Sequence, residues 1–244
     1  NAYDEDRMAV LRLLAPYIAV ALDNSRKLRT IQELNRQLEG EKKELERAYG
    51  RIEHLANHDI LTGLPNRRLL VELIHDHIPL ARRQQQVFAL LYVDIDNFKP
   101  VNDSHGHEMG DQVLIRIADR LRSAVRQSDT VARIGGDEFV LVLRDVRGTD
   151  EAKAIAAKVL AGIAQPLSLG EIICVLAASV GVSLFPADGE SYNELLVAAD
   201  QAMYRAKEAG KAGIALAGDP DYRGRTSTLD ESIESPSNVK RPST

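Results

Sequence analysis

The stretch VARIGGDEFVLVL, from Val131 to Leu143, constrains the fold of this chain more than any other segment. Both halves are rich in the branched and apolar residues of buried strands. Between them stand two glycines, which permit turn conformations and leave room beside the backbone. Two carboxylates follow, Asp137 and Glu138, which repel each other unless a cation or solvent compensates. We therefore expect a β-hairpin whose turn admits a bulky ligand and a cation.

The segments around this hairpin alternate between strand and helix patterns. Strands are predicted over VFALLYVDIDNF, TVARI, EFVLVL, IICVLAASVGVSLF (with a break at Gly181) and GIALA. Helices are predicted over residues 66–84, 108–125, 150–165 and over SYNELLVAADQAMYRAKEAG, opened by Ser191 and closed by Gly210. Interleaved strands and helices with one tight hairpin favour a layered α+β fold.

The N-terminal part is predicted to be helical. Residues 1–30 are apolar on one face, with acids near the start and Pro16 interrupting the pattern. Residues 31–57 carry an a/d heptad seam, which predicts a coiled-coil linker that forms a homodimer. The alternative is one amphipathic helix packed on its own domain. The seam consists of Ile31, Leu34, Leu38, Glu41, Leu45, Ala48, Ile52 and Leu55.

Charge and cysteine content exclude some classes of protein. The net charge of −5 argues against a binder of nucleic acid polymers through a basic surface. The single cysteine allows no intrachain disulfide and fits a reducing, cytoplasmic compartment. The run LLAPYIAVAL is about half the ~20 residues that a membrane span needs, so we expect no membrane segment in this chain. The chain begins with Asn1 and not Met, so we expect a fragment. The tail, residues 218–244, is rich in Ser, Pro and Thr and is predicted to be disordered.

A second group of acids stands at the end of a predicted strand. Asp94 and Asp96 in LLYVDIDNF share one face by the period of two. If this strand lies beside the hairpin, Asp94, Asp137 and Glu138 can converge into the oxygen ligands that Mg²⁺ prefers, and Mg²⁺ usually arrives with phosphates. The alternative is solvated turn acids. The chain contains neither GxxxxGK[ST] nor GxGxxG, which excludes a P-loop and a dinucleotide fold.

Four motifs together resemble one family. RIGGDEF, DIDNFKPVNDSHGHEMGD, LTGLPNRR and ADQAMYRAKEAGK are similar, in order and spacing, to the motifs of GGDEF-domain diguanylate cyclases, over residues 58–217. The resemblance implies a palm-like, ferredoxin-type fold related to nucleotide cyclases. It implies a nucleotidyltransferase that condenses two GTP into cyclic di-3′,5′-GMP and two pyrophosphates, as a dimer with two Mg²⁺ or Mn²⁺ ions per half-site. The helix at 1–30 resembles the last helix of a GAF sensor domain.

The resemblance also implies roles for individual residues. Metal ligands would be Asp94, the carbonyl of Ile95, Asp137 and Glu138, and the last two would also be catalytic together with Lys99. The implied substrate-binding residues are Asn102, His107, Asp111, Gly135, Gly136, Lys207 and Lys211. The R-x-x-D pair Arg126 and Asp129 would form an inhibitory site for the product.

One departure from the family matters. The family usually continues G-R-N after the last long helix, where this chain has Gly210, Lys211 and Ala212. Lysine keeps the charge but loses the bidentate fork of arginine. An alternative function is therefore a catalytically inactive module that binds GTP or cyclic di-GMP as a regulator.

Overall fold

The structure, a computed structural model, describes residues 2–170 and 172–219, and it divides into two compact units, residues 1–56 and 57–244. The first unit consists of the helix α1 (Ala2–Asn57), which continues through Pro16. The apolar seam residues of α1 are each more than half exposed: Ile31, Leu34, Leu38, Leu45, Ile52 and Leu55. From residue 220 onward the predicted disordered tail lies outside the described residues.

One described helix, over Met8–Asn57 of α1, is long and apolar enough to cross a membrane by length and composition. Helices that never enter a membrane pass the same test, so this is weak evidence for a span. The predicted absence of a membrane segment stays a prediction.

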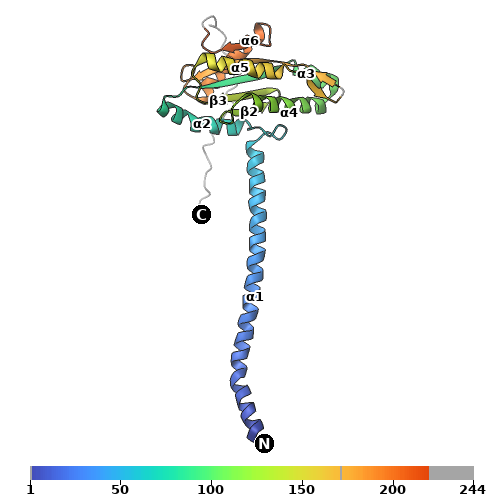
Figure 1. The fold of residues 1–244 in the computed structure, drawn as a ribbon, viewed down its shortest axis with the longest axis vertical. Coiled ribbons are helices and arrows are strands. Elements are labelled where there is room, and N and C mark those ends of the chain that lie inside the picture. The colour runs from blue at the N-terminus through green and yellow to red at the C-terminus, as the bar shows by residue number, and fades with distance from the viewer. Residues whose placement is uncertain (1, 171, 220–244) are drawn as a thin grey trace, which may run out of the picture. The chain divides into compact units, whose positions relative to one another are not determined.

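The second unit is a five-stranded sheet with helices on both faces (Figure 1). Its strand order is β2-β3-β1-β6-β7, and a separate two-stranded sheet pairs β4 with β5. The strands are β1 (Phe88–Asp96), β2 (Thr130–Gly135), β3 (Glu138–Leu143), β4 (Leu167–Leu169), β5 (Ile172–Cys174), β6 (Ala177–Phe185) and β7 (Ile214–Leu216). The helices are α2 (Arg67–Gln84), α3 (Phe98–His105), α4 (His107–Ala124), α5 (Thr149–Ile163) and α6 (Tyr192–Glu208). The predicted α+β fold is confirmed.

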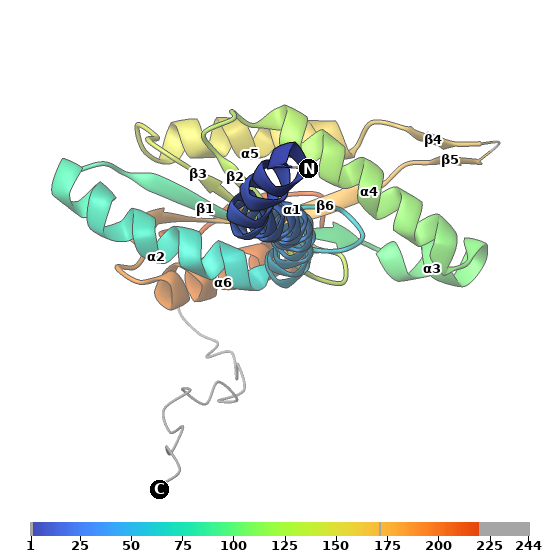
Figure 2. The same cartoon turned by 90° about the horizontal axis from the view of Figure 1, so that it is seen from below.

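The two sides of the sheet have separate cores. Figure 2 shows α4 and α5 on one side of the sheet and α2 and α6 on the other. Along β1, Leu91 and Val93 belong to the α4–α5 core, whereas Leu90 and Tyr92 belong to the α2–α6 core. This central strand is buried along its whole length, as expected for a strand covered on both faces. Asp94 and Asp96 share the register of Leu90 and Tyr92, so they face the α6 side.

Side-chain caps begin two of the predicted helices, and Ser191 is the one that the sequence predicts. Asn66 caps α2 by accepting from the Leu69 N–H, and Ser191 caps α6 by accepting from the Glu194 N–H. The cap oxygens satisfy N–H groups that have no partner inside the helix. Both predicted helix starts are therefore correct.

The prediction of one long strand over 172–185 with a break at Gly181 is wrong. The strand is instead interrupted at residues 175–176, between β5 and β6, and β6 continues without interruption through Gly181. A Cβ at Gly181 would collide with the Ala199 carbonyl oxygen and the Met203 nitrogen of α6. The glycine therefore allows a helix backbone to lie directly on the strand.

The strand β4 and the short helix α3 were not predicted. α3 follows β1 with a single residue between them, Asn97 in the left-handed conformation (φ 57°). Eight residues, of which only Phe98 is buried, give too short a pattern for the helical period to stand out.

Candidate functional site

The glycine–acid turn lies between β2 and β3, as the sequence predicts. Gly136 has φ +46°, a conformation that favours glycine. No described atom lies within 4 Å of the position that a Cβ would take at Gly135 or Gly136. The turn therefore has open space beside its backbone.

The hairpin carries its acids to the end of β1. β3 pairs with β1 so that Glu138 stands opposite Asp94, and the Ile95 N–H donates to the Asp137 carbonyl at 3.3 Å. Asp94 is 9% exposed, and Asp137 and Glu138 are half-buried. The predicted pairing of this strand with the hairpin is thus confirmed, whereas the convergence of all three acids on one ion stays a prediction.

A lysine from α6 lies against this group. Lys207 Nζ lies 2.7 Å from Asp94 Oδ1, with the two side chains 29% and 12% exposed. Burial raises the pKa of Asp94, an effect that Lys207 partly offsets and that the charges of Asp137 and Asp96 reinforce. The lysine is thus a counter-ion within an excess of acids.

Polar groups of β1 and α6 act on Glu138 of the hairpin. Burial raises the pKa of Glu138, the hydroxyl of Tyr92 on β1 donates a hydrogen bond that offsets this, and the charges of Asp94, Asp137 and Asp200 add to the increase. Burial likewise raises the pKa of Asp200 on α6, where Lys207 acts in the opposite direction. Sequence reasoning missed Asp200 and Tyr92. The signal for Asp200 is its position seven residues before Lys207, two turns back on the same helix face.

A second carboxylate of the DID motif has a different task. Asp96 is 5% exposed and accepts from the Ser179 hydroxyl at 2.9 and 3.1 Å and from the Ala212 N–H at 2.9 Å. Lys211 and Ala212 both have positive φ, 67° and 52°. Lys211 Nζ donates to the side-chain oxygen of Asn97 at 2.8 Å. Asp96 therefore joins the end of β1 to the loop that follows α6.

The other predicted substrate residues lie on α3 and α4. Asn102 of α3 lies against Gly110 of α4, where any Cβ would collide with its side-chain oxygen. Asp111 follows Gly110, so the pair predicted to read guanine lies on two adjoining helices. Lys99 in the first turn of α3 and His107 at the start of α4 are exposed.

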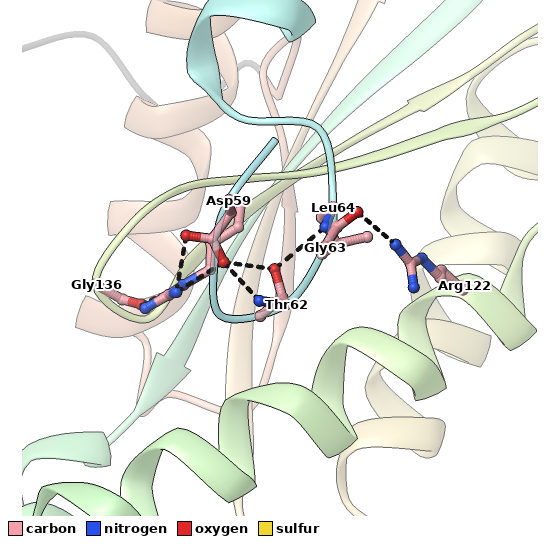
Figure 3. A network of polar contacts seen from close by, with 7 residues as sticks. Asp59, Thr62, Gly63, Leu64, Arg122 and Gly136 are labelled. Atoms are coloured by element: carbon pink, nitrogen blue, oxygen red, sulfur yellow. Dashed lines mark hydrogen bonds and ion pairs between the residues drawn. The ribbon is translucent and has the colours of Figure 1, made fainter. Parts of the chain in front are cut away.

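An arginine of β2 fixes the acid-bearing turn. Arg133 donates through Nε and Nη2 to the Gly136 carbonyl at 2.9 and 2.7 Å. Its Nη1 donates to both carboxylate oxygens of Asp59 at 2.9 and 3.1 Å. Thr62 donates its N–H and hydroxyl to the same Asp59, as Figure 3 shows. Burial acts to raise the pKa of Asp59, but the bonds from Thr62 and Arg133 outweigh it and hold that pKa below its ordinary value. Sequence reasoning missed this network.

The predicted inhibitory pair lies in the turn between α4 and β2. Asp129 accepts from the Arg126 N–H at 2.9 Å and from the Arg144 N–H at 3.0 Å. The guanidinium of Arg126 pairs with Glu151 of α5 at 3.2 Å. Arg126 and Asp129 both line a surface pocket of about 550 Å³, which Arg122 and Pro65 also line. The two residues therefore lie together, and Asp129 also has a structural role in the turn.

The donors at the end of β1 suit a hard divalent cation. Carboxylate and carbonyl oxygens are the ligands that Mg²⁺ takes in proteins. The ammonium of Lys207 on Asp94 shows that this carboxylate binds a cation. Among the described residues, however, no three His, Cys, Asp or Glu side chains are grouped closely enough to hold a metal as they stand. The donor set nevertheless fits such an ion by its chemistry.

Known proteins with the same pattern are numerous. The family model described as "Diguanylate cyclase, GGDEF domain" matches residues 56–213. The chain is 44% identical over 169 residues to the bifunctional diguanylate cyclase/cyclic di-GMP phosphodiesterase MucR of Pseudomonas aeruginosa, covering 69% of this chain and 24% of that protein. It is 37% identical over 167 residues to the diguanylate cyclase TpbB of the same species, covering 68% of this chain and 38% of TpbB. The chain thus spans well under half the length of these relatives.

Solved structures agree with the sequence comparison. The isolated GGDEF domain of TpbB matches with a TM-score of 0.64 and 37% identity, covering 66% of this chain and 94% of that one. Diguanylate cyclase SiaD of Pseudomonas aeruginosa, solved with its activator SiaC, matches with a TM-score of 0.63 and 28% identity, covering 88% and 82%. The matching residues include the hairpin and the strand whose acids meet in this site. The chain therefore belongs to the GGDEF family of diguanylate cyclase domains.

Proposed function

We propose that this chain is an active diguanylate cyclase that condenses two GTP into cyclic di-GMP and two pyrophosphates. The observation that carries the proposal is the meeting of Asp94, Asp137 and Glu138 beside the open glycine turn, with Lys207 as the nearby cation. An inactive domain would have no need to keep Asp94 and Glu138 where burial raises their pKa values.

The residues have distinct tasks in this proposal. Asp94, the Ile95 carbonyl, Asp137 and Glu138 would hold two divalent ions, Mg²⁺ or Mn²⁺, which when bound supply charge stabilisation on the reacting phosphate. Lys99, Lys207 and Lys211 bind the other phosphate oxygens. Asp111 accepts from guanine N1–H and N2–H₂, which adenine lacks, and Asn102 hydrogen-bonds the same edge. His107 lies near the substrate.

Two copies of the chain are needed for one product. Each 3′-hydroxyl attacks the α-phosphorus of the other GTP, its proton passes to Asp137, and the bond to the pyrophosphate breaks. One domain holds one GTP, so two domains must face each other, and the seam on α1 raises their effective concentration. The exposed leucines of that seam support a homodimer.

Replacing Leu38 and Leu45 by serine should give monomers with little activity, measured by light scattering and by product formation. Full activity from a confirmed monomer would contradict this arrangement.

We further propose that cyclic di-GMP inhibits the enzyme at Arg126 and Asp129. The pocket beside them supports this. A solved microbial GGDEF domain, 31% identical with a TM-score of 0.58, interacts with cyclic di-GMP. Arginine can stack on guanine and pair with phosphate. Arg126→Ala should weaken product binding, measured by calorimetry.

We place the reaction in the cytoplasm, and the residues at 1–30 at the end of a GAF sensor domain.

The deciding experiment is product formation from GTP. The purified chain is incubated with GTP and Mg²⁺, and cyclic di-GMP is followed by chromatography, with Asp137→Asn in parallel. Product from the wild type and none from the variant is the expected result. No product from a verified dimer would refute the proposal.

That negative result would favour the second candidate, an inactive module that binds GTP or cyclic di-GMP. Two observations support this candidate. Lys211, at the family's arginine position, is bonded to Asn97. A relative 39% identical over 168 residues is named cyclic di-GMP phosphodiesterase NbdA. Binding of radiolabelled cyclic di-GMP without turnover is its signature.

A further inference from the structure

The ion pair between Lys207 and Asp94 is built into the packing of the domain. Its 2.7 Å contact joins the last turn of α6 to the end of β1, and neither side chain is more than a third exposed. One turn before the lysine, the Met203 backbone lies directly on Gly181 of β6, and β6 pairs with β1. The helix backbone therefore cannot drift, and the ammonium is held within reach of this carboxylate.

This contact engages the same carboxylate that a metal ion would use. Mg²⁺ binds carboxylate oxygens at about 2.0–2.1 Å. A dication at that distance from Asp94 would lie beside the ammonium, and the two positive charges would repel each other strongly in a partly buried site. The ion can enter only if Lys207 moves away. The ammonium then needs another anion, because an unpaired buried charge is costly.

We propose that Lys207 is the resident cation of Asp94 in the ligand-free enzyme and moves to the triphosphate when metal and GTP enter together. This inference rests on the proposed function, since it takes Asp94 as a metal ligand and GTP as the substrate. Metal and nucleotide then bind cooperatively: the metal displaces the lysine from Asp94, and the phosphates accept the displaced lysine. The metal alone binds weakly, because its entry leaves the ammonium without an anion.

The nearby charges support this exchange. Asp94, Asp137, Glu138 and Asp200 act on one another electrostatically, and Lys207 is the cation that acts on both Asp94 and Asp200. Removal of that ammonium takes away a positive charge that offsets Asp94 and Asp200, and the attraction of these acids for a free divalent ion rises.

The experiment measures Mn²⁺ binding without nucleotide, by the electron paramagnetic resonance signal of free Mn²⁺. Lys207→Met should bind Mn²⁺ about fivefold or more tightly than the wild type, the range of a coupling between two sites. The matched control is Lys211→Met, which removes a positive charge four residues away that contacts the neutral amide of Asn97. Its Mn²⁺ affinity should stay within about twofold of the wild type. Lys207→Arg keeps a cation and should bind Mn²⁺ as weakly as the wild type.

The second arm adds a non-hydrolysable GTP analogue. The analogue should strengthen Mn²⁺ binding to the wild type more than to Lys207→Met, because only the wild type has a lysine to transfer. Equal Mn²⁺ affinity of the wild type and a folded Lys207→Met, checked by circular dichroism, would overturn the inference. An equal rise in nucleotide-free Mn²⁺ affinity in Lys207→Met and Lys211→Met would also overturn it, since the change in net charge alone would then explain the effect. A wild type that binds no Mn²⁺ even with the analogue would instead overturn the metal site of the proposed function.

Discussion

The contact between Arg133 and Asp59 gives the sharpest prediction about how the glycine–acid turn is held. Removing the Arg133 side chain breaks two bonds to Asp59 and two to the Gly136 carbonyl. Breaking a fully buried ion pair costs about 3–5 kcal/mol, whereas exposed pairs contribute about 0.2–1 kcal/mol. The side chains of this pair are 12% and 24% exposed, and one guanidinium nitrogen, Nη1, contacts both carboxylate oxygens. We therefore expect Arg133→Ala to lower the free energy of unfolding by about 2 kcal/mol.

A double-mutant cycle separates the pair from its surroundings. Urea unfolding of Asp59→Asn, Arg133→Ala and the double variant should give a coupling of about 1–2 kcal/mol. The control cycle uses Arg82 and Glu190, whose 2.8 Å contact lies between side chains 60% and 69% exposed. That pair should couple by less than about 0.5 kcal/mol. Equal couplings in the two cycles would refute the reasoning, because burial would then make no difference.

The pH dependence of the same pair follows from the sign of the shift. The pKa of Asp59 is lowered from 3.8, so its ionised form stabilises the fold above that pH. The stabilisation is lost as the pH falls through the lower, folded-state value. The effect of Arg133→Ala should therefore shrink in acid. Cyclase activity of this variant should also fall, because Gly136 loses its anchor.

Three further outcomes are expected. Gly181→Ala should lower the free energy of unfolding, measured in urea, by about 1–3 kcal/mol or more, because the α6 backbone lies where the Cβ would be. Gly162→Ala in α5, where the Cβ would enter open space, should raise the free energy of unfolding by about 0.5–1 kcal/mol. Glu138→Gln should raise the free energy of unfolding by on the order of 1 kcal/mol at pH 8 and change it little at pH 4. Burial raises the pKa of Glu138 above 4.5, so its charge lowers the stability only at a pH where the carboxyl is ionised. A larger stabilisation at pH 4 than at pH 8 would contradict this. Ala212→Asn should raise the free energy of unfolding by about 1 kcal/mol and with it the midpoint of thermal unfolding, because φ is 52° at this residue and asparagine tolerates that conformation better than alanine. An unchanged midpoint would contradict this.

Local patterns in the sequence were enough to predict most of the elements. The hairpin was predictable because glycines stand between two apolar runs, and the starts of α2 and α6 because Asn66 and Ser191 cap them. Gly181 misled the prediction because a glycine in a strand marks either a break or a close approach, and only the position of α6 decides between them. β5 was joined wrongly to β6 because Ile173 and Val175 are apolar and yet exposed.

The acids and the cations of the site differ in how far the sequence could reveal them. Asp94, Asp137 and Glu138 were predictable from the residues beside them, because each follows or interrupts an apolar strand. Their partners depend on the order of the strands and on which helix covers which face. β1 lies between β3 and β6, so Asp94 meets Glu138 on one side and lies under α6, where Lys207 reaches it. Asp59 is likewise 74 residues from Arg133, and the two meet because the Arg133 N–H also donates to the Pro65 carbonyl of the same loop. Asp94 and Asp59 are thus each paired with a cation from a distant element, and a local sequence pattern cannot reveal such a pairing.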